Sequence, residues 1–125
     1  MARILIVDDS RTSRKILKEA LSEAGYDIAG EASNGEEGII MYRELKPDIV
    51  TMDITMPVMN GLEALAFIKR EDHNAKVIMV TAAGQKEKMV QAIKEGADDF
   101  ITKPFEPEQV LDSIKHVLDT DWTEK

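Results

Sequence analysis

Ile4-Leu5-Ile6-Val7-Asp8-Asp9 is the stretch of sequence that decides the fold. Its four apolar residues are contiguous, which is typical of a strand buried on both faces of a sheet. The run ends abruptly in two carboxylates. Three later runs also end in a reactive polar residue: residues 49–52 before Asp53, 77–80 before Thr81, and 100–102 before Lys103.

Helical patterns alternate with these runs. Apolar residues recur at helical spacing in segments 16–24, 38–45, 62–68, 90–97 and 110–118. Residues 28–32 form a weaker strand that suits a sheet edge. Alternating strands and helices of this length form right-handed crossovers and a parallel sheet with helices on both faces. The sequence therefore predicts one α/β domain with a doubly wound parallel sheet, built from five strand–helix units.

The polar residues at the strand ends predict a site. Ligands of open parallel sheets bind beyond the carboxyl ends of the strands. If the strand order is 2-1-3-4-5, the first and third strands lie about 4.8 Å apart, and Asp8, Asp9 and Asp53 crowd together. Carboxylates at that range repel one another unless a cation binds. An oxygen-only site with open coordination positions suits Mg²⁺ better than Zn²⁺, while Thr81 and Lys103 would favour an anion with several oxygens.

Each of these residues also has an ordinary structural explanation. An aspartate can cap a helix or turn, a threonine can close a turn, and a lysine can lie on the surface along its apolar stem. For one residue alone the structural explanation is preferred. Four such positions at four strand ends favour a functional site, although an acidic edge that binds metal without chemistry remains an alternative.

Composition narrows the class of protein. The 125 residues are 43% hydrophobic and fit a single core. The 16 basic and 24 acidic residues give a net charge of −8, which argues against nucleic acid as a partner. There is no cysteine, and no apolar stretch approaches the roughly 20 residues that cross a bilayer. We therefore expect a cytoplasmic protein without a membrane partner.

Five short motifs resemble the response-regulator receiver domain of two-component signalling, and most closely its stand-alone chemotaxis receivers. They lie, in the order typical of that family, at residues 4–9, 48–57, 59–61, 80–82 and 103–105. The resemblance spans about residues 3–118. It implies a flavodoxin-like fold with strand order 2-1-3-4-5, a receiver domain over residues 1–119, a polar C-terminal tail at 120–125 and no output domain.

The resemblance also implies a role for each acidic residue. Asp53 resembles the phosphoacceptor, which takes a phosphoryl group from a phosphohistidine of a histidine kinase. Asp9 would bind Mg²⁺ directly and Asp8 through water, with Asp53 and the backbone carbonyl of Thr55 as further ligands. Phosphoryl transfer depends mainly on positioning and charge neutralisation, which these groups supply.

Further positions follow from the same resemblance. Lys103 would pair with a phosphoryl oxygen, and the peptide bond before Pro104 would be cis. Thr81 would bind another phosphoryl oxygen, and the space it vacates would let Phe100 turn inward as a switch; a fixed core ring is the competing interpretation of Phe100. The helix of about residues 86–95, the strand of Phe100 and the final helix would form the output surface.

Two further positions tune the lifetime of the phosphoryl group in this family. They are Thr55, two residues after the phosphoacceptor, and Ala83, two residues after Thr81. Neither side chain offers a carboxylate or carboxamide that could orient an attacking water. We therefore expect slower loss of the phosphoryl group than in relatives that carry an acid or amide at these positions.

The implied function is a monomeric, phospho-accepting signalling switch, not an enzyme with a diffusing product, that assists its own phosphorylation and dephosphorylation. Its partner would be a flagellar motor switch protein in chemotaxis. The first alternative is a phosphorelay carrier that passes phosphate to a histidine phosphotransfer protein. A further alternative is a haloacid-dehalogenase-like phosphatase, but that class expects a second aspartate where this chain has Thr55.

Overall fold

The computed structural model describes residues 2–123, with side chains described as far as Asp119. Strands and helices alternate along these residues, as the apolar pattern predicts. They are β1 (Arg3–Val7), α1 (Arg11–Glu23), β2 (Asp27–Ala32), α2 (Gly35–Leu45), β3 (Ile49–Asp53), α3 (Gly61–Glu71), β4 (Val77–Ala82), α4 (Lys86–Lys94), β5 (Asp99–Lys103) and α5 (Pro107–Thr123).

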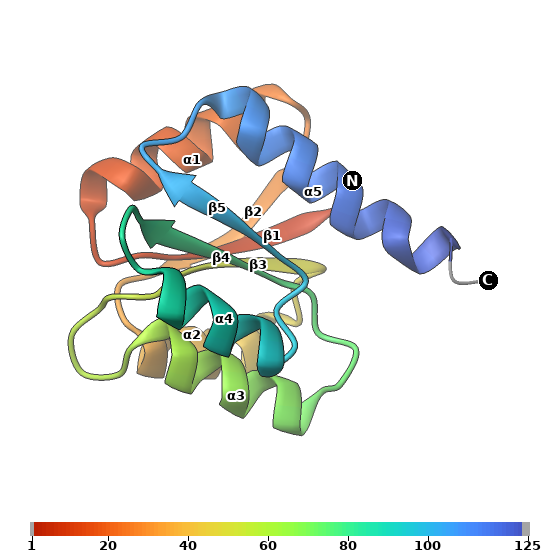
Figure 1. Cartoon of the computed structure of the whole chain (residues 1–125). Coiled ribbons are helices and arrows are strands. Elements are labelled where there is room, and N and C mark those ends of the chain that lie inside the picture. Colours follow the sequence, from red (N-terminus) through yellow and green to blue (C-terminus); the bar gives the residue numbers. More distant parts are fainter. Residues whose placement is uncertain (1, 124–125) are drawn as a thin grey trace.

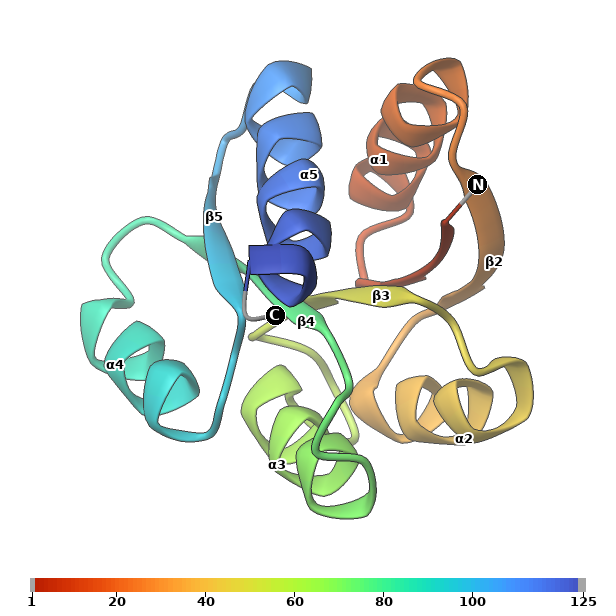
Figure 2. The same cartoon turned by 90° about the vertical axis from the view of Figure 1, so that its right-hand side faces the viewer.

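The strands form one parallel sheet in the order β2-β1-β3-β4-β5. Helices α1 and α5 cover one face, and α2, α3 and α4 cover the other (Figures 1 and 2). The chain reverses its direction of travel across the sheet between β1 and β3, which is where ligands of such sheets bind. The flavodoxin-like fold and its strand order are therefore confirmed.

Alternate residues of each strand feed two separate cores, because successive side chains of a strand point to opposite faces. In β1, Ile4 and Ile6 join the core beneath α1 and α5, whereas Leu5 and Val7 join the core beneath α2 and α3. All four side chains are at most 1% exposed. This burial on both faces explains why the run is continuously apolar.

Helix caps fix the ends of the two loops that follow β1 and β3. Ser10, directly after Asp8 and Asp9, caps α1 by accepting a hydrogen bond from the backbone N–H of Ser13. Asn60 and Glu63 form a capping box at the start of α3, which ends the loop after Asp53. Such caps contribute about 1 kcal/mol each and define where each loop stops.

The predicted polar tail at residues 120–125 is helical in the part that the structure describes. Helix α5 continues to Thr123, and residues 124 and 125 lie outside the described residues. Within residues 2–123, no helix is both long and apolar enough to cross a membrane.

Gly61, the first residue of α3, lies directly against the end of β3. Its backbone N–H donates a 2.7 Å hydrogen bond to the carbonyl of Ile54. A Cβ atom at this position would fall against the carbonyl oxygen of Asp53 and the Cα of Ile54. Only glycine lets α3 begin this close to the strand end that carries Asp53.

We predict that Gly61→Ala destabilises the protein by about 1–3 kcal/mol, the usual cost of overpacking against atoms that cannot move aside. Gly30→Ala is the matched control, because a Cβ there meets only the flexible ends of Met41, Leu45 and Leu5. Urea unfolding measures both free energies. Equal losses of stability in the two variants would contradict this account of Gly61.

Candidate functional site

The strand register brings the predicted site residues to one edge of the sheet. Val7, just before Asp8, pairs with Met52, just before Asp53. Asp53 in turn pairs with Val80, the residue before Thr81. Lys103, at the end of β5, pairs with Ala82. Chain segments far apart in sequence thus deliver their polar residues to the carboxyl ends of neighbouring strands.

Three carboxylates form the centre of this edge. Asp8, Asp9 and Asp53 each place an oxygen so that all three oxygens lie within 4.8 Å of one another. Asp8 is 1% and Asp53 7% exposed, whereas Asp9 is exposed to solvent. The cluster therefore has a buried side toward the sheet and an open side toward water.

Lys103 is the ammonium group of the site. Its Nζ lies 3.0 Å from Asp8 Oδ2 and 3.4 Å from Asp53 Oδ2. Burial acts to lower the pKa of this ammonium, but hydrogen bonding and charge attraction from Asp8 and Asp53 outweigh it and raise the pKa. Lys103 therefore stays protonated. The peptide bond between Lys103 and Pro104 is cis.

Asp53 is electrostatically unusual. Burial, followed by the negative charge of Asp8, raises the pKa of its carboxyl from 3.8 to about 6, although Lys103 opposes the rise. Without a further cation, the ionised form of this carboxylate lowers the free energy of unfolding. A group in this state gains from any ligand that adds positive charge beside it.

Asp8 is held in place from its own loop. Its Oδ1 accepts a 2.8 Å hydrogen bond from the backbone N–H of Ser10, and its backbone carbonyl accepts a 2.6 Å bond from Arg14 Nη1. Sequence reasoning missed Arg14, although its place one turn into α1 put it within reach of the loop. Arg14 thus helps to orient Asp8 without belonging to the carboxylate cluster.

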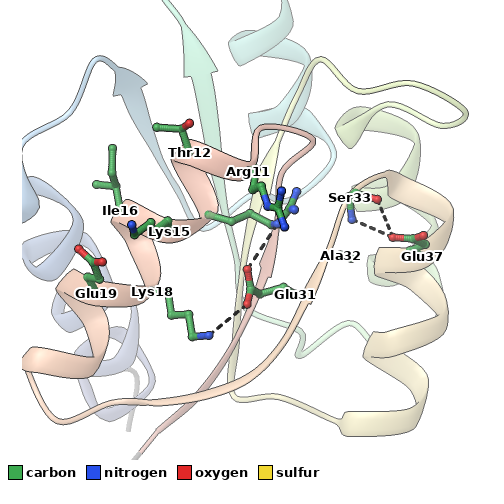
Figure 3. Close-up of a pocket in the computed structure, with 11 residues that line it drawn as sticks. Arg11, Thr12, Lys15, Ile16, Lys18, Glu19, Glu31, Ala32, Ser33 and Glu37 are labelled. Carbon is green, nitrogen blue, oxygen red and sulfur yellow. Dashed lines mark hydrogen bonds and ion pairs between the residues drawn. The ribbon is translucent and has the colours of Figure 1, made fainter.

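A separate pocket opens beside the cluster, between α1 and β2 (Figure 3). Glu31 on β2 forms ion pairs with Arg14 at 3.4 Å and Lys18 at 3.5 Å, and Ser33 donates to Glu37 at 2.9 Å. None of the residues that line the pocket is a predicted site residue. The two ion pairs connect α1 to the edge strand, and the hydrogen bond connects the end of β2 to α2.

The carboxylate cluster fits Mg²⁺. Among the described residues, three carboxylates and one ammonium leave a formal charge of −2 (−3 + 1), which a divalent cation balances. Asp8 Oδ2 is buried, and it lies 3.0 Å from the Lys103 ammonium, with which it forms an ion pair. An oxygen-only donor set with one open side is the kind of site that Mg²⁺ occupies with several waters retained.

Thr81 lies in β4 and is completely buried. Its hydroxyl donates to Gln85 Oε1 at 2.7 Å, and Gln85 Nε2 donates to Thr55 Oγ1 at 3.0 Å. Sequence reasoning missed Gln85. It considered only the positions two residues after Asp53 and Thr81, whereas the chain places a carboxamide four residues after Thr81.

The remaining predicted positions lie on β5 and in the loops after β3 and β4. Phe100 lies on β5 and is 38% exposed, so its interpretation as a fixed core ring is wrong. Ala83 is exposed in the turn after β4, and Thr55 is exposed in the loop after β3.

The raised pKa of Asp53 predicts a pH-dependent stability. Its carboxyl titrates near 6 when folded and near 3.8 when unfolded, so protonation of Asp53 favours the folded state. This contribution to the free energy of unfolding is complete below about pH 4 and is lost as pH rises through 6. The carboxamide introduced by Asp53→Asn does not titrate. The excess stability of this variant over wild type should therefore grow between pH 4 and 7, to on the order of 2 kcal/mol.

Chemical unfolding across this pH range, with EDTA present, checks the expectation. Asp112→Asn, the same substitution at an exposed position, provides the control for the change of side chain itself. A difference for Asp53→Asn that stays flat or shrinks with rising pH would contradict the account.

Comparison with known proteins places this geometry in a family. Residues 4–115 match the response regulator receiver domain. The chemotaxis protein CheY of Thermotoga maritima is 53% identical over 115 residues, covering 92% of this chain and 96% of the relative. Protein CcdB of Bacillus subtilis is 51% identical over 118 residues, covering 94% and 98%.

A solved structure agrees with the fold. A chain of the CheX–CheY–BeF3–Mg+2 complex from Borrelia burgdorferi superposes with a TM-score of 0.90 at 39% identity, covering 94% of this chain and 89% of that chain. The sheet order, the acidic edge and the match over residues 4–115 identify this chain as a member of the response-regulator receiver family of two-component signalling.

Proposed function

We propose that this chain is a phospho-accepting switch: Asp53 accepts a phosphoryl group from a histidine kinase, and the phosphorylated form binds a partner protein. The observation that carries the proposal is the convergence of three carboxylates within 4.8 Å beside the Lys103 ammonium. A cluster that needs added positive charge, and has one open side, suits a reaction that brings Mg²⁺ and a phosphoryl group together.

In this reaction an oxygen of Asp53 attacks the phosphorus of the phosphohistidine. The P–N bond breaks, and the imidazole nitrogen keeps the electron pair and takes a proton from solvent. Lys103 pairs with one phosphoryl oxygen, and the Thr81 hydroxyl donates to another. Water later hydrolyses the acyl phosphate, which restores the Asp53 carboxylate and releases phosphate.

Asp8, Asp9, Asp53 and the backbone carbonyl of Thr55 would hold the Mg²⁺. When bound, the ion supplies charge neutralisation for the attacking carboxylate and the incoming group. Arg14 and Ser10 contribute indirectly, because they orient Asp8 through its carbonyl and its Oδ1.

The output surface lies on α4, β5 and α5. Val90 and Ile93 on α4 are 46% and 54% exposed, and Phe100 on β5 is 38% exposed. Large apolar side chains this exposed suit contact with a partner protein. Phosphorylation would draw Thr81 inward and let the Phe100 ring follow, which changes this surface.

For the partner, we propose a flagellar motor switch protein in chemotaxis, in keeping with the CheY relatives. A phosphorelay role, with transfer to a histidine phosphotransfer protein, is the second candidate because it needs the same Asp53 chemistry. We do not propose a haloacid-dehalogenase-like phosphatase, since the chain belongs to the receiver family and carries Thr55 where that class expects aspartate.

Labelling with radioactive acetyl phosphate tests the proposal. Wild type should incorporate label with Mg²⁺ and lose nearly all incorporation in excess EDTA. Asp53→Asn should reduce incorporation at least about 100-fold, because it removes the nucleophile. Asp112→Asn replaces an exposed aspartate and should label like wild type. Wild-type protein that stays unlabelled, or an equally labelled Asp53→Asn, would refute the proposal.

The fate of the label separates the two partner classes. Labelled wild type is incubated either with a purified motor switch protein or with a histidine phosphotransfer protein. It should bind the motor switch protein and keep its label. Rapid movement of label onto the phosphotransfer protein would support the phosphorelay instead. The Asp53→Asn variant shows how much binding is independent of phosphorylation.

A further inference from the structure

Gln85 bridges the two loops that flank the carboxylate cluster. It is the residue before α4, yet its side chain makes no cap hydrogen bond with that helix. The side chain instead accepts a 2.7 Å hydrogen bond from the Thr81 hydroxyl and donates a 3.0 Å hydrogen bond to Thr55 Oγ1. One carboxamide therefore joins the end of β4 to the loop after β3.

The hydrogen bond from Thr81 to Gln85 occupies the proton that Thr81 could donate to another acceptor. A threonine hydroxyl carries a single proton and can be a good donor to one acceptor at a time. Here the closer acceptor is Gln85 Oε1 at 2.7 Å, and the other is the Ala82 carbonyl at 3.2 Å. Thr81 is 0% exposed, so water does not offer its hydroxyl an alternative partner.

We propose that Gln85 is a positioning residue that restrains Thr81 in the unphosphorylated protein, so that Gln85 and a phosphoryl oxygen compete for the same hydroxyl proton. This inference rests on the proposed function, because the competing phosphoryl group is the one on Asp53. Gln85 acts on that group only through Thr81 and sets how readily the switched state forms.

The restraint also reaches the output surface. When Thr81 turns to the phosphoryl group, Gln85 Oε1 loses its partner and the bridge from β4 to the β3–α3 loop is released at one end. Gln85 directly precedes α4, the helix that presents Val90 and Ile93. Release of the bridge thus frees the N-terminal end of the helix that carries part of the output surface.

Beryllofluoride with Mg²⁺, a mimic of the phosphoryl group, is the probe. Its apparent affinity is measured by titration of backbone amide NMR shifts. Gln85→Ala should bind it about fivefold more tightly than wild type, the factor that one net neutral hydrogen bond contributes to an equilibrium. Gln91→Ala is the matched control: it is the same substitution at an exposed position of α4 and should leave the affinity unchanged.

A Thr81→Val background tests whether Gln85 acts through the Thr81 hydroxyl. Without the hydroxyl there is no proton to compete for, so Gln85→Ala should no longer change the affinity there. Thermal unfolding by circular dichroism verifies that each variant is folded. An unchanged or weaker affinity of Gln85→Ala, or an equal gain in the Thr81→Val background, would overturn this inference alone. Wild type that fails to bind the probe would overturn the proposed function, and this inference with it.

Discussion

Like-charge repulsion at one edge of the sheet is the constraint on which the rest of the site depends. Asp8, Asp9 and Asp53 hold oxygens within 4.8 Å of one another, with Lys103 as the ammonium that partly balances them. Burial and Asp8 raise the pKa of Asp53 to about 6. The fold holds these charges together against their mutual repulsion, and a divalent cation bound beside them would reduce that repulsion.

The fold maintains this arrangement through its backbone. Parallel register delivers Asp53 and Lys103 to the same edge, and helix caps end the loops that follow β1 and β3. Gly61 allows α3 to begin against the end of β3. Because the sheet register and these caps hold the acidic edge in place, the open side of the cluster can exchange ligands while the sheet stays unchanged.

Sequence reasoning predicted the parallel sheet because continuous apolar runs separated by helical patterns admit few alternatives, whereas the strand order came from the family resemblance. It also located the polar strand ends, since a residue that follows a buried strand of a parallel sheet lies at the carboxyl edge of that sheet. It missed Arg14 and Gln85, because each acts through a side chain reaching across loops whose conformation no periodicity specifies. The extent of α5 was also misjudged, since a polar segment can extend a helix that packing has already started.

The central claim is that this charge cluster makes Asp53 the acceptor of a phosphoryl group. Borohydride reduces an aspartyl phosphate to homoserine, so reduction after treatment with acetyl phosphate and Mg²⁺, followed by peptide mass spectrometry, locates the acceptor directly. The account predicts homoserine at position 53 and unmodified aspartate at positions 8 and 9. Homoserine at another position, or none at position 53 in protein shown to carry phosphate, would contradict it.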